Sequence, residues 1–147
     1  MRPDPATVLG AIAGAIAAEL PTTPTPFGQQ TLGIAASLSM MLAQDIDRAP
    51  ARLVDEYRAT AAILHDAVPL LDDSELATRI DDALAHDVLA DLHVSALQTA
   101  DDTVRALLVE VHARVETMPG PEAAALNERI WEELKESTRR RHLVTGI

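Results

Sequence analysis

Two histidines near the middle of the chain, His86 and His93, are the residues best suited by type to acid–base or ligand chemistry. They are seven residues apart, so on a helix they share one face. Asp82 lies four residues before His86, a spacing at which its carboxylate can orient the imidazole. We therefore treat His86, His93 and Asp82 as candidate catalytic residues. The alternative is that both histidines are polar side chains at the rim of an apolar stripe.

Three further side chains, Tyr57, His65 and His112, are candidates for ligand binding. Tyr57 and His65 are eight residues apart, which places them at the edges of one broad helical face. His112 lies at the edge of an apolar stripe, with Glu116 one turn further on. Each also has a plain structural interpretation, as a rim side chain or a solvent-edge ion pair. A pocket lined by the candidates would suit a small-molecule enzyme or a binding protein.

No metal site is expected. On a helix, His86 and His93 would lie about 10.5 Å apart along the axis, whereas nitrogen ligands lie about 2.0–2.1 Å from a single zinc ion. The chain has no cysteine, which excludes disulfides, thiolate nucleophiles and zinc–cysteine sites. The motifs of zinc peptidases, α/β hydrolases and nucleotide-binding loops are missing as well. The sequence therefore leaves the cofactor, if the protein has one, unknown.

The candidate catalytic and ligand-binding residues must be positioned by secondary structure, and the sequence predicts helices. No Pro or Gly interrupts residues 71–99, where apolar side chains recur every four positions from Leu76 to Leu92. This pattern predicts one long helix, capped at its start by Asp72 or Asp73. It would place His86 and His93 on a rigid element at the centre of the chain.

Five further helices are predicted from apolar periodicity, capping residues and prolines. We expect them over residues 5–20, 27–48, 50–68, 101–118 and 122–142. The first is capped by Asp4, the second by Thr25, and the third starts at Pro50. Asp101, Asp102 and Thr103 are expected to cap the fifth. No long segment alternates with period two, so we predict an all-α fold: one domain over residues 1–147, a bundle of about six helices.

The composition restricts the classes of partner. The net charge is −11 and only 2% of residues are aromatic. Nucleic-acid binding requires a basic surface and usually stacking aromatic rings, so it is not expected. The same charge disfavours an anionic membrane surface, and the apolar run in the first helix is too short to cross a bilayer. We expect a soluble, cytoplasmic protein.

The first two predicted helices carry almost no charge. Between Met1 and Gln44 the charged residues are Arg2, Asp4 and Glu19. The second helix nevertheless has a regular apolar stripe, which we assign to the core side: Ile34, Leu38, Met41, Leu42 and Ile46. Two such helices are either buried by the rest of the chain or packed against a second copy in a homo-oligomer.

Three adjacent arginines, at positions 139–141, end the last predicted helix. They complement the helix dipole there. They could also bind an acidic ligand such as a phosphate. A solvated helix end is the simpler interpretation.

The opening part of the chain resembles a family of small uncharacterised helical bacterial proteins. The similar residues are Pro5, Leu9, Pro21, Phe27, Ala35, Ala36 and Leu38, with Ala125, Leu126 and Asn127 near the end. Members tend to be encoded beside acyl-CoA dehydrogenase and aminoglycoside-phosphotransferase-like genes. The resemblance implies an accessory role in acyl or other small-molecule catabolism. We therefore expect a non-enzymatic interaction protein that self-associates through its N-terminal helices and binds a protein partner or a small molecule.

Overall fold

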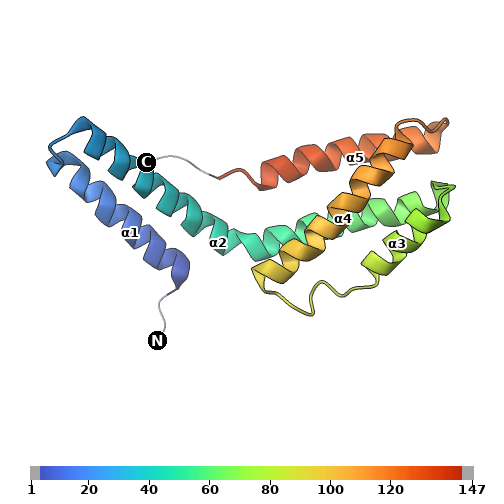
Figure 1. Cartoon of the computed structure of the whole chain (residues 1–147), viewed down its shortest axis with the longest axis horizontal. Coiled ribbons are helices and arrows are strands. Elements are labelled where there is room, and N and C mark those ends of the chain that lie inside the picture. The colour runs from blue at the N-terminus through green and yellow to red at the C-terminus, as the bar shows by residue number, and fades with distance from the viewer. Residues whose placement is uncertain (1–3, 144–147) are drawn as a thin grey trace. The chain divides into compact units, whose positions relative to one another are not determined.

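The computed structural model describes residues 4–143, and every regular element within them is helical (Figure 1). The predicted all-α class is therefore confirmed. Five α-helices are present rather than six. They are α1 (Pro5–Glu19), α2 (Pro26–Ala67), α3 (Ser74–Leu84), α4 (Val94–Val115) and α5 (Pro121–Arg140), with short 3-10 helices η1 (Leu20–Thr22) and η2 (Val68–Leu70).

Three helices begin where side chains cap free backbone N–H groups. The Asp4 carboxylate accepts from the Thr7 amide at 2.8 Å, and the Thr25 hydroxyl accepts from the Gly28 amide at 3.1 Å. The Asp73 carboxylate likewise accepts from the Leu76 amide at 2.9 Å at the start of α3. Each bond satisfies one of the donors that the first turn leaves without a partner. The predicted caps of these three helices are confirmed.

The predicted break at Pro50 is wrong. Pro50 lies inside α2, which continues to Ala67. Proline removes one helical hydrogen bond and crowds the preceding turn. The flanking residues Ala49 and Ala51 favour helix, and Leu53 and Val54 are buried just beyond. Their burial offsets the cost of one proline.

The predicted long central helix is also wrong. The chain leaves the helical conformation at the end of α3 and becomes helical again at the start of α4. The Asp87 carboxylate accepts from the Leu89 amide, and the Asp91 carboxylate accepts from the His93 amide, both at 2.9 Å. Hydrogen bonds from a backbone amide to a side chain two residues earlier compete with the backbone hydrogen bonds of a helix. A linker over residues 85–93 results, and it separates His86 from the start of α4.

The helices gather in two compact units, which we describe separately. One contains α1 and the part of α2 up to Ala49; the other runs from Pro50 to Arg141. In the second unit, α4 contacts both α3 and α5. The core of this unit consists of Tyr57, Ile63, Leu64, Ala67, Leu76, Ile80, Val104, Leu107, Leu108, Val111, Val115, Leu126 and Ile130. This core is almost free of aromatic rings, as the composition predicts.

The first unit is a helical hairpin in which the chain reverses between α1 and α2 (Figure 1). Its buried side chains are all alanines: Ala13 in α1, with Ala36, Ala43 and Ala49 in α2. Alanine lets helices approach closely but removes little apolar area from water. The hairpin therefore contributes no core of large side chains of its own.

Candidate functional site

A cavity of about 420 Å³ lies in the second unit, where α2, α3, the 85–93 linker and α4 meet. Its volume falls within the range of small-molecule sites. Two of the six sequence-predicted site residues, Tyr57 and His86, line it. The full lining is Tyr57, Ala83, His86, Val88, Ala96, Thr99, Ala100 and Thr103. Tyr57 is buried, whereas His86, Thr99 and Thr103 are exposed and surround the opening.

Hydrogen bonds fix the polar atoms around this cavity. The Tyr57 hydroxyl donates to the Ala83 carbonyl oxygen over 3.4 Å. Burial raises the pKa of Tyr57, and the negative charge of Asp87 raises it further. The Nδ1 atom of His86 lies 3.2 Å from the Asp82 carbonyl oxygen. Asp82 thus holds this imidazole through its backbone, whereas the sequence analysis assigned that role to its carboxylate.

The other three candidate histidines, His65, His93 and His112, do not line the cavity. His65 is exposed beside Asp66 at 3.3 Å, in a separate depression. His93 is exposed and pairs with Asp91, with a contact of 2.5 Å. Among residues 4–143, no three His, Asp or Glu side chains are grouped so that they could hold a metal ion.

His112 lies in a different place, between α4 and α5. Its Nε2 atom is 3.0 Å from the Asn127 side-chain oxygen and 3.5 Å from the Glu116 carboxylate. The imidazole also meets Trp131 edge to face, with ring centroids 5.3 Å apart. These contacts fit a side chain that joins two helices, so His112 shares no site with Tyr57.

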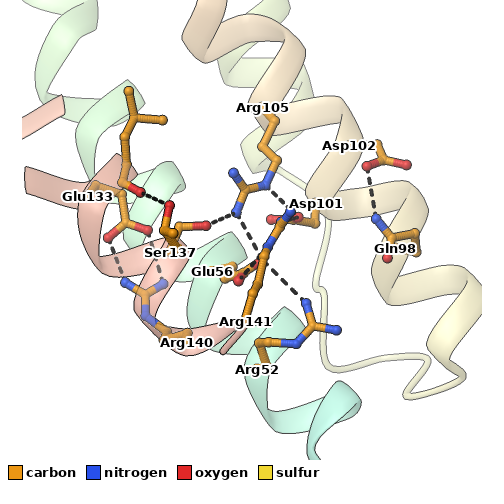
Figure 2. Close-up of polar contacts among 12 residues, drawn as sticks. Arg52, Glu56, Gln98, Asp101, Asp102, Arg105, Glu133, Ser137, Arg140 and Arg141 are labelled. Atoms are coloured by element: carbon orange, nitrogen blue, oxygen red, sulfur yellow. Dashed lines mark hydrogen bonds and ion pairs between the residues drawn. The ribbon is translucent and has the colours of Figure 1, made fainter. Parts of the chain in front are cut away.

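A buried ionic cluster, which the sequence analysis missed, connects α2, α4 and α5 (Figure 2). Glu56 and Asp101 are both fully buried. Arg105 bridges them: its Nε donates to Asp101 over 2.7 Å, and one Nη donates to Glu56 over 2.9 Å. The same Nη lies 2.9 Å from the Ser137 hydroxyl. Asp101 is thus an internal residue of α4 and not the helix cap that its position in the sequence predicted.

Two more arginines complete this cluster. Arg141 donates to both Glu56 carboxylate oxygens, over 3.1 and 2.8 Å, and lies 3.7 Å from Asp101. Arg52 approaches Glu56 to 3.7 Å from one turn away. Three guanidinium groups therefore surround two carboxylates. The terminal arginines are not simply a solvated helix end, because Arg141 binds a buried partner.

The two carboxylates respond to this environment in opposite directions. Burial alone would raise the pKa of Glu56. The hydrogen bonds and charge of Arg141, with the charges of Arg105 and Arg52, outweigh burial, so its pKa lies below the ordinary 4.5. For Asp101, burial dominates and raises the pKa above 3.8 despite Arg105, and the neighbouring charge of Glu56 adds to the rise. Within the described chain, the Asp101 Oδ1 atom is buried and has no hydrogen-bond partner.

The hairpin presents a different kind of candidate site. The α2 stripe that the sequence analysis assigned to the core is largely exposed, which corrects that assignment. Ile34, Leu38, Leu42 and Ile46 are each more than 40% exposed, and Phe27 is 80% exposed. The residues from Ile34 to Ile46 in this set are spaced four apart, so they form one ridge of the helix.

Helix α1 also has exposed apolar surface. It exposes Val8 and Ile12, and a side chain added at Gly10 or Gly14 would meet nothing within 4 Å. The segment Pro5–Thr22 has 18 residues and a mean hydropathy of 1.3, so its length and composition allow a membrane crossing. The sequence analysis had considered this apolar run too short. A helix that is apolar all round requires a covering surface.

Comparison of the chain with protein-family models, curated proteins and solved structures finds no match. Three features of the described residues could support a function: the cavity, the buried ionic cluster and the exposed apolar hairpin.

Proposed function

We propose that the protein is a non-enzymatic interaction protein that self-associates through its N-terminal hairpin. The observation that carries the proposal is the exposed ridge of α2, formed by Ile34, Leu38, Leu42 and Ile46. Full burial of a side chain of this kind stabilises a contact by about 1.5–3 kcal/mol. The same hairpin from a second copy would supply a matching ridge, and two such ridges interdigitate at a common helix crossing angle. The product would be an intermolecular helical bundle.

The charge distribution directs contact between two copies to the hairpin. The chain has a net charge of −11, so two copies repel each other over most of their surfaces. The hairpin is the exception to this repulsion, because its only charged side chains from residue 4 to residue 44 are Asp4 and Glu19. Contact through the hairpins buries apolar area and brings few like charges together.

A lipid bilayer suits this hairpin less well. The α2 half carries Gln29, Gln30 and Thr31, and all three side chains are exposed. Polar amides in hydrocarbon cost free energy unless they find partners. The wet rim of a protein interface accommodates them. The proposal therefore places a protein surface, and not a membrane, against α1 and α2.

The test is a measurement of molar mass by light scattering or sedimentation. The wild-type chain should be dimeric or larger at micromolar concentration, and Leu38→Glu should be monomeric. Val109→Glu is the matched control, because Val109 is a comparably exposed apolar residue on α4, in the other unit. It should leave the mass unchanged. A wild-type monomer throughout the micromolar range would refute self-association, and vesicle binding by the wild type would assign the hairpin to lipid.

The accessory role in acyl or small-molecule catabolism, which the family resemblance implies, stays a prediction. So does the cytoplasmic location. Purifying the wild-type chain and Leu38→Glu from the same cells would test the accessory role. A catabolic enzyme retained only by the wild type would identify the partner that the self-associated form recruits.

A further inference from the structure

We propose that the cavity beside Tyr57 binds a small primary amine with an apolar body. This assignment is independent of self-association, since the cavity belongs to the second unit. Its volume of about 420 Å³ equals that of about 14 water molecules in the liquid. A short alkylamine or an arylalkylamine fits within this volume.

The wall of the cavity is suited to an apolar body. Ala83, Val88, Ala96 and Ala100 provide methyl groups, and Tyr57 adds the buried face of its ring. Small side chains on two facing helices leave the space open, and no charged side chain lines it. An apolar group placed here would be removed from water.

The polar groups around the cavity are acceptors, because their protons are already used. The hydroxyls of Thr99 and Thr103 donate to helix carbonyl oxygens one turn earlier, over 2.9 and 2.8 Å. The Tyr57 hydroxyl donates to Ala83. The Nδ1 atom of His86 faces the Asp82 carbonyl oxygen, which can only accept, so the tautomer that donates this bond leaves Nε2 with a lone pair. A ligand that supplies donors therefore complements this site.

The local charge selects a cation among the donors. Residues 81–91, which include the lining residues Ala83, His86 and Val88, contain four acidic side chains and no Lys or Arg. Within this segment, the charge of Asp87 reaches the Tyr57 hydroxyl and raises its pKa. An ammonium group brings three donors and a positive charge. A carboxylate of the same size would bring neither and would be repelled.

The test compares three ligands with the same body: hexylamine, hexanol and hexanoate. Each is titrated into the ¹⁵N-labelled full-length chain, and amide shifts are followed by NMR. Hexylamine should shift amides in residues 83–103 and should bind at least about tenfold more tightly than hexanol, because hydrogen bonds from charged donors are stronger. Hexanoate should bind weakest of the three. Equal affinities, tighter hexanoate binding, or shifts confined to the hairpin would overturn the assignment.

Variants locate the binding site within the second unit. Ala100→Leu fills the cavity and should abolish the shifts. Thr99→Val removes an acceptor without changing the shape, and it should weaken hexylamine several-fold while leaving hexanoate unaffected. Thr138→Val is the control, since Thr138 makes the same kind of bond to a helix carbonyl on α5, away from the cavity. Undiminished hexylamine binding by both Ala100→Leu and Thr99→Val would refute the site, even if Ala100→Leu alone perturbed folding.

Discussion

Neutralising Glu56 should destabilise the second unit far more than neutralising Asp101, although both carboxylates are fully buried and share Arg105. Glu56→Gln and Asp101→Asn each replace one carboxylate oxygen by an amide nitrogen. That cost is common to the two variants, so the difference between them reports the charge. The folded protein favours ionised Glu56, whose pKa is lowered, and disfavours ionised Asp101, whose pKa is raised.

The expected magnitude follows from the contacts of Glu56. It accepts three hydrogen bonds from Arg105 and Arg141. Removal of one partner from a buried ion pair costs about 3–5 kcal/mol. Arg141 keeps 47% of its side chain exposed and can recover some hydration, so we expect the lower end, about 3 kcal/mol. Asp101→Asn should change the free energy of unfolding by less than about 1 kcal/mol, because it relieves a buried charge.

Urea unfolding followed by circular dichroism measures both values. With a slope of about 1–3 kcal/mol per molar urea, Glu56→Gln should lower the midpoint by about 1–3 M. Ser137→Ala is a useful third variant, since it removes a single neutral partner of Arg105. If Asp101→Asn proved as costly as Glu56→Gln, the opposite assignment of the two carboxylates would be refuted.

Acid should erase the difference between the wild type and Glu56→Gln. When folding lowers the pKa of a carboxyl group, the ionised group stabilises the folded state. This stabilisation is fully present at pH values above the pKa of the unfolded chain, near 4.5, and is lost as the pH falls through the pKa of the folded chain. Asp101 has the opposite sign, because its raised pKa means that the folded state binds the proton more tightly. The difference in free energy of unfolding between the wild type and Glu56→Gln should therefore shrink below pH 4.5 and stay constant above about pH 6.

Three further predictions concern the backbone and the core, and each is measured as a shift in the unfolding midpoint. Gly120 has a φ of 111°, so Gly120→Ala should cost about 1–3 kcal/mol, whereas Gly33→Ala, in open space within α2, should stabilise by about 0.5–1 kcal/mol. Ile130→Ala should cost about 2–5 kcal/mol, against less than about 0.5 kcal/mol for exposed Val109→Ala. Pro50→Ala should raise the stability of α2, because it restores a helical hydrogen bond; a lower midpoint would mean that the proline has a structural role.

Three of the helix starts could be predicted from the sequence because capping is local, whereas the starts predicted at Pro50 and Asp101 are wrong. Asp4, Thr25 and Asp73 each bind an amide three residues further on. Helix ends were harder, since the outcome depends on a competition. Asp87 and Asp91 lie inside the single helix predicted over residues 71–99, yet their side chains bind amides two residues away and end the helical run. That turn brings His86 to the cavity with Tyr57 and leaves His93 outside it.

The buried ionic cluster could not be predicted, because its members meet only after folding. Charge patterning treats an Asp or an Arg as solvated unless a partner is close in sequence. The spacing of Asp101 and Arg105, and that of Arg52 and Glu56, were the available signals, and four-residue spacing is common on exposed helices. Glu56 and Arg141 are far apart in the sequence, so their spacing does not reveal that they are in contact.

Periodicity identifies which face of a helix is apolar, but not whether the same chain supplies a partner for it. The stripes of α2 and α4 both repeat at helical spacing in the sequence. The α4 stripe, which includes Val104 and Val111, is buried in the second unit, while that of α2, with Leu38 and Leu42, stays exposed on the hairpin. The two differ because the hairpin contains only two helices, and its buried side chains are alanines. The regularity of an exposed stripe is therefore itself evidence for a partner, since an irregular apolar surface could not pack against a second helix along its length.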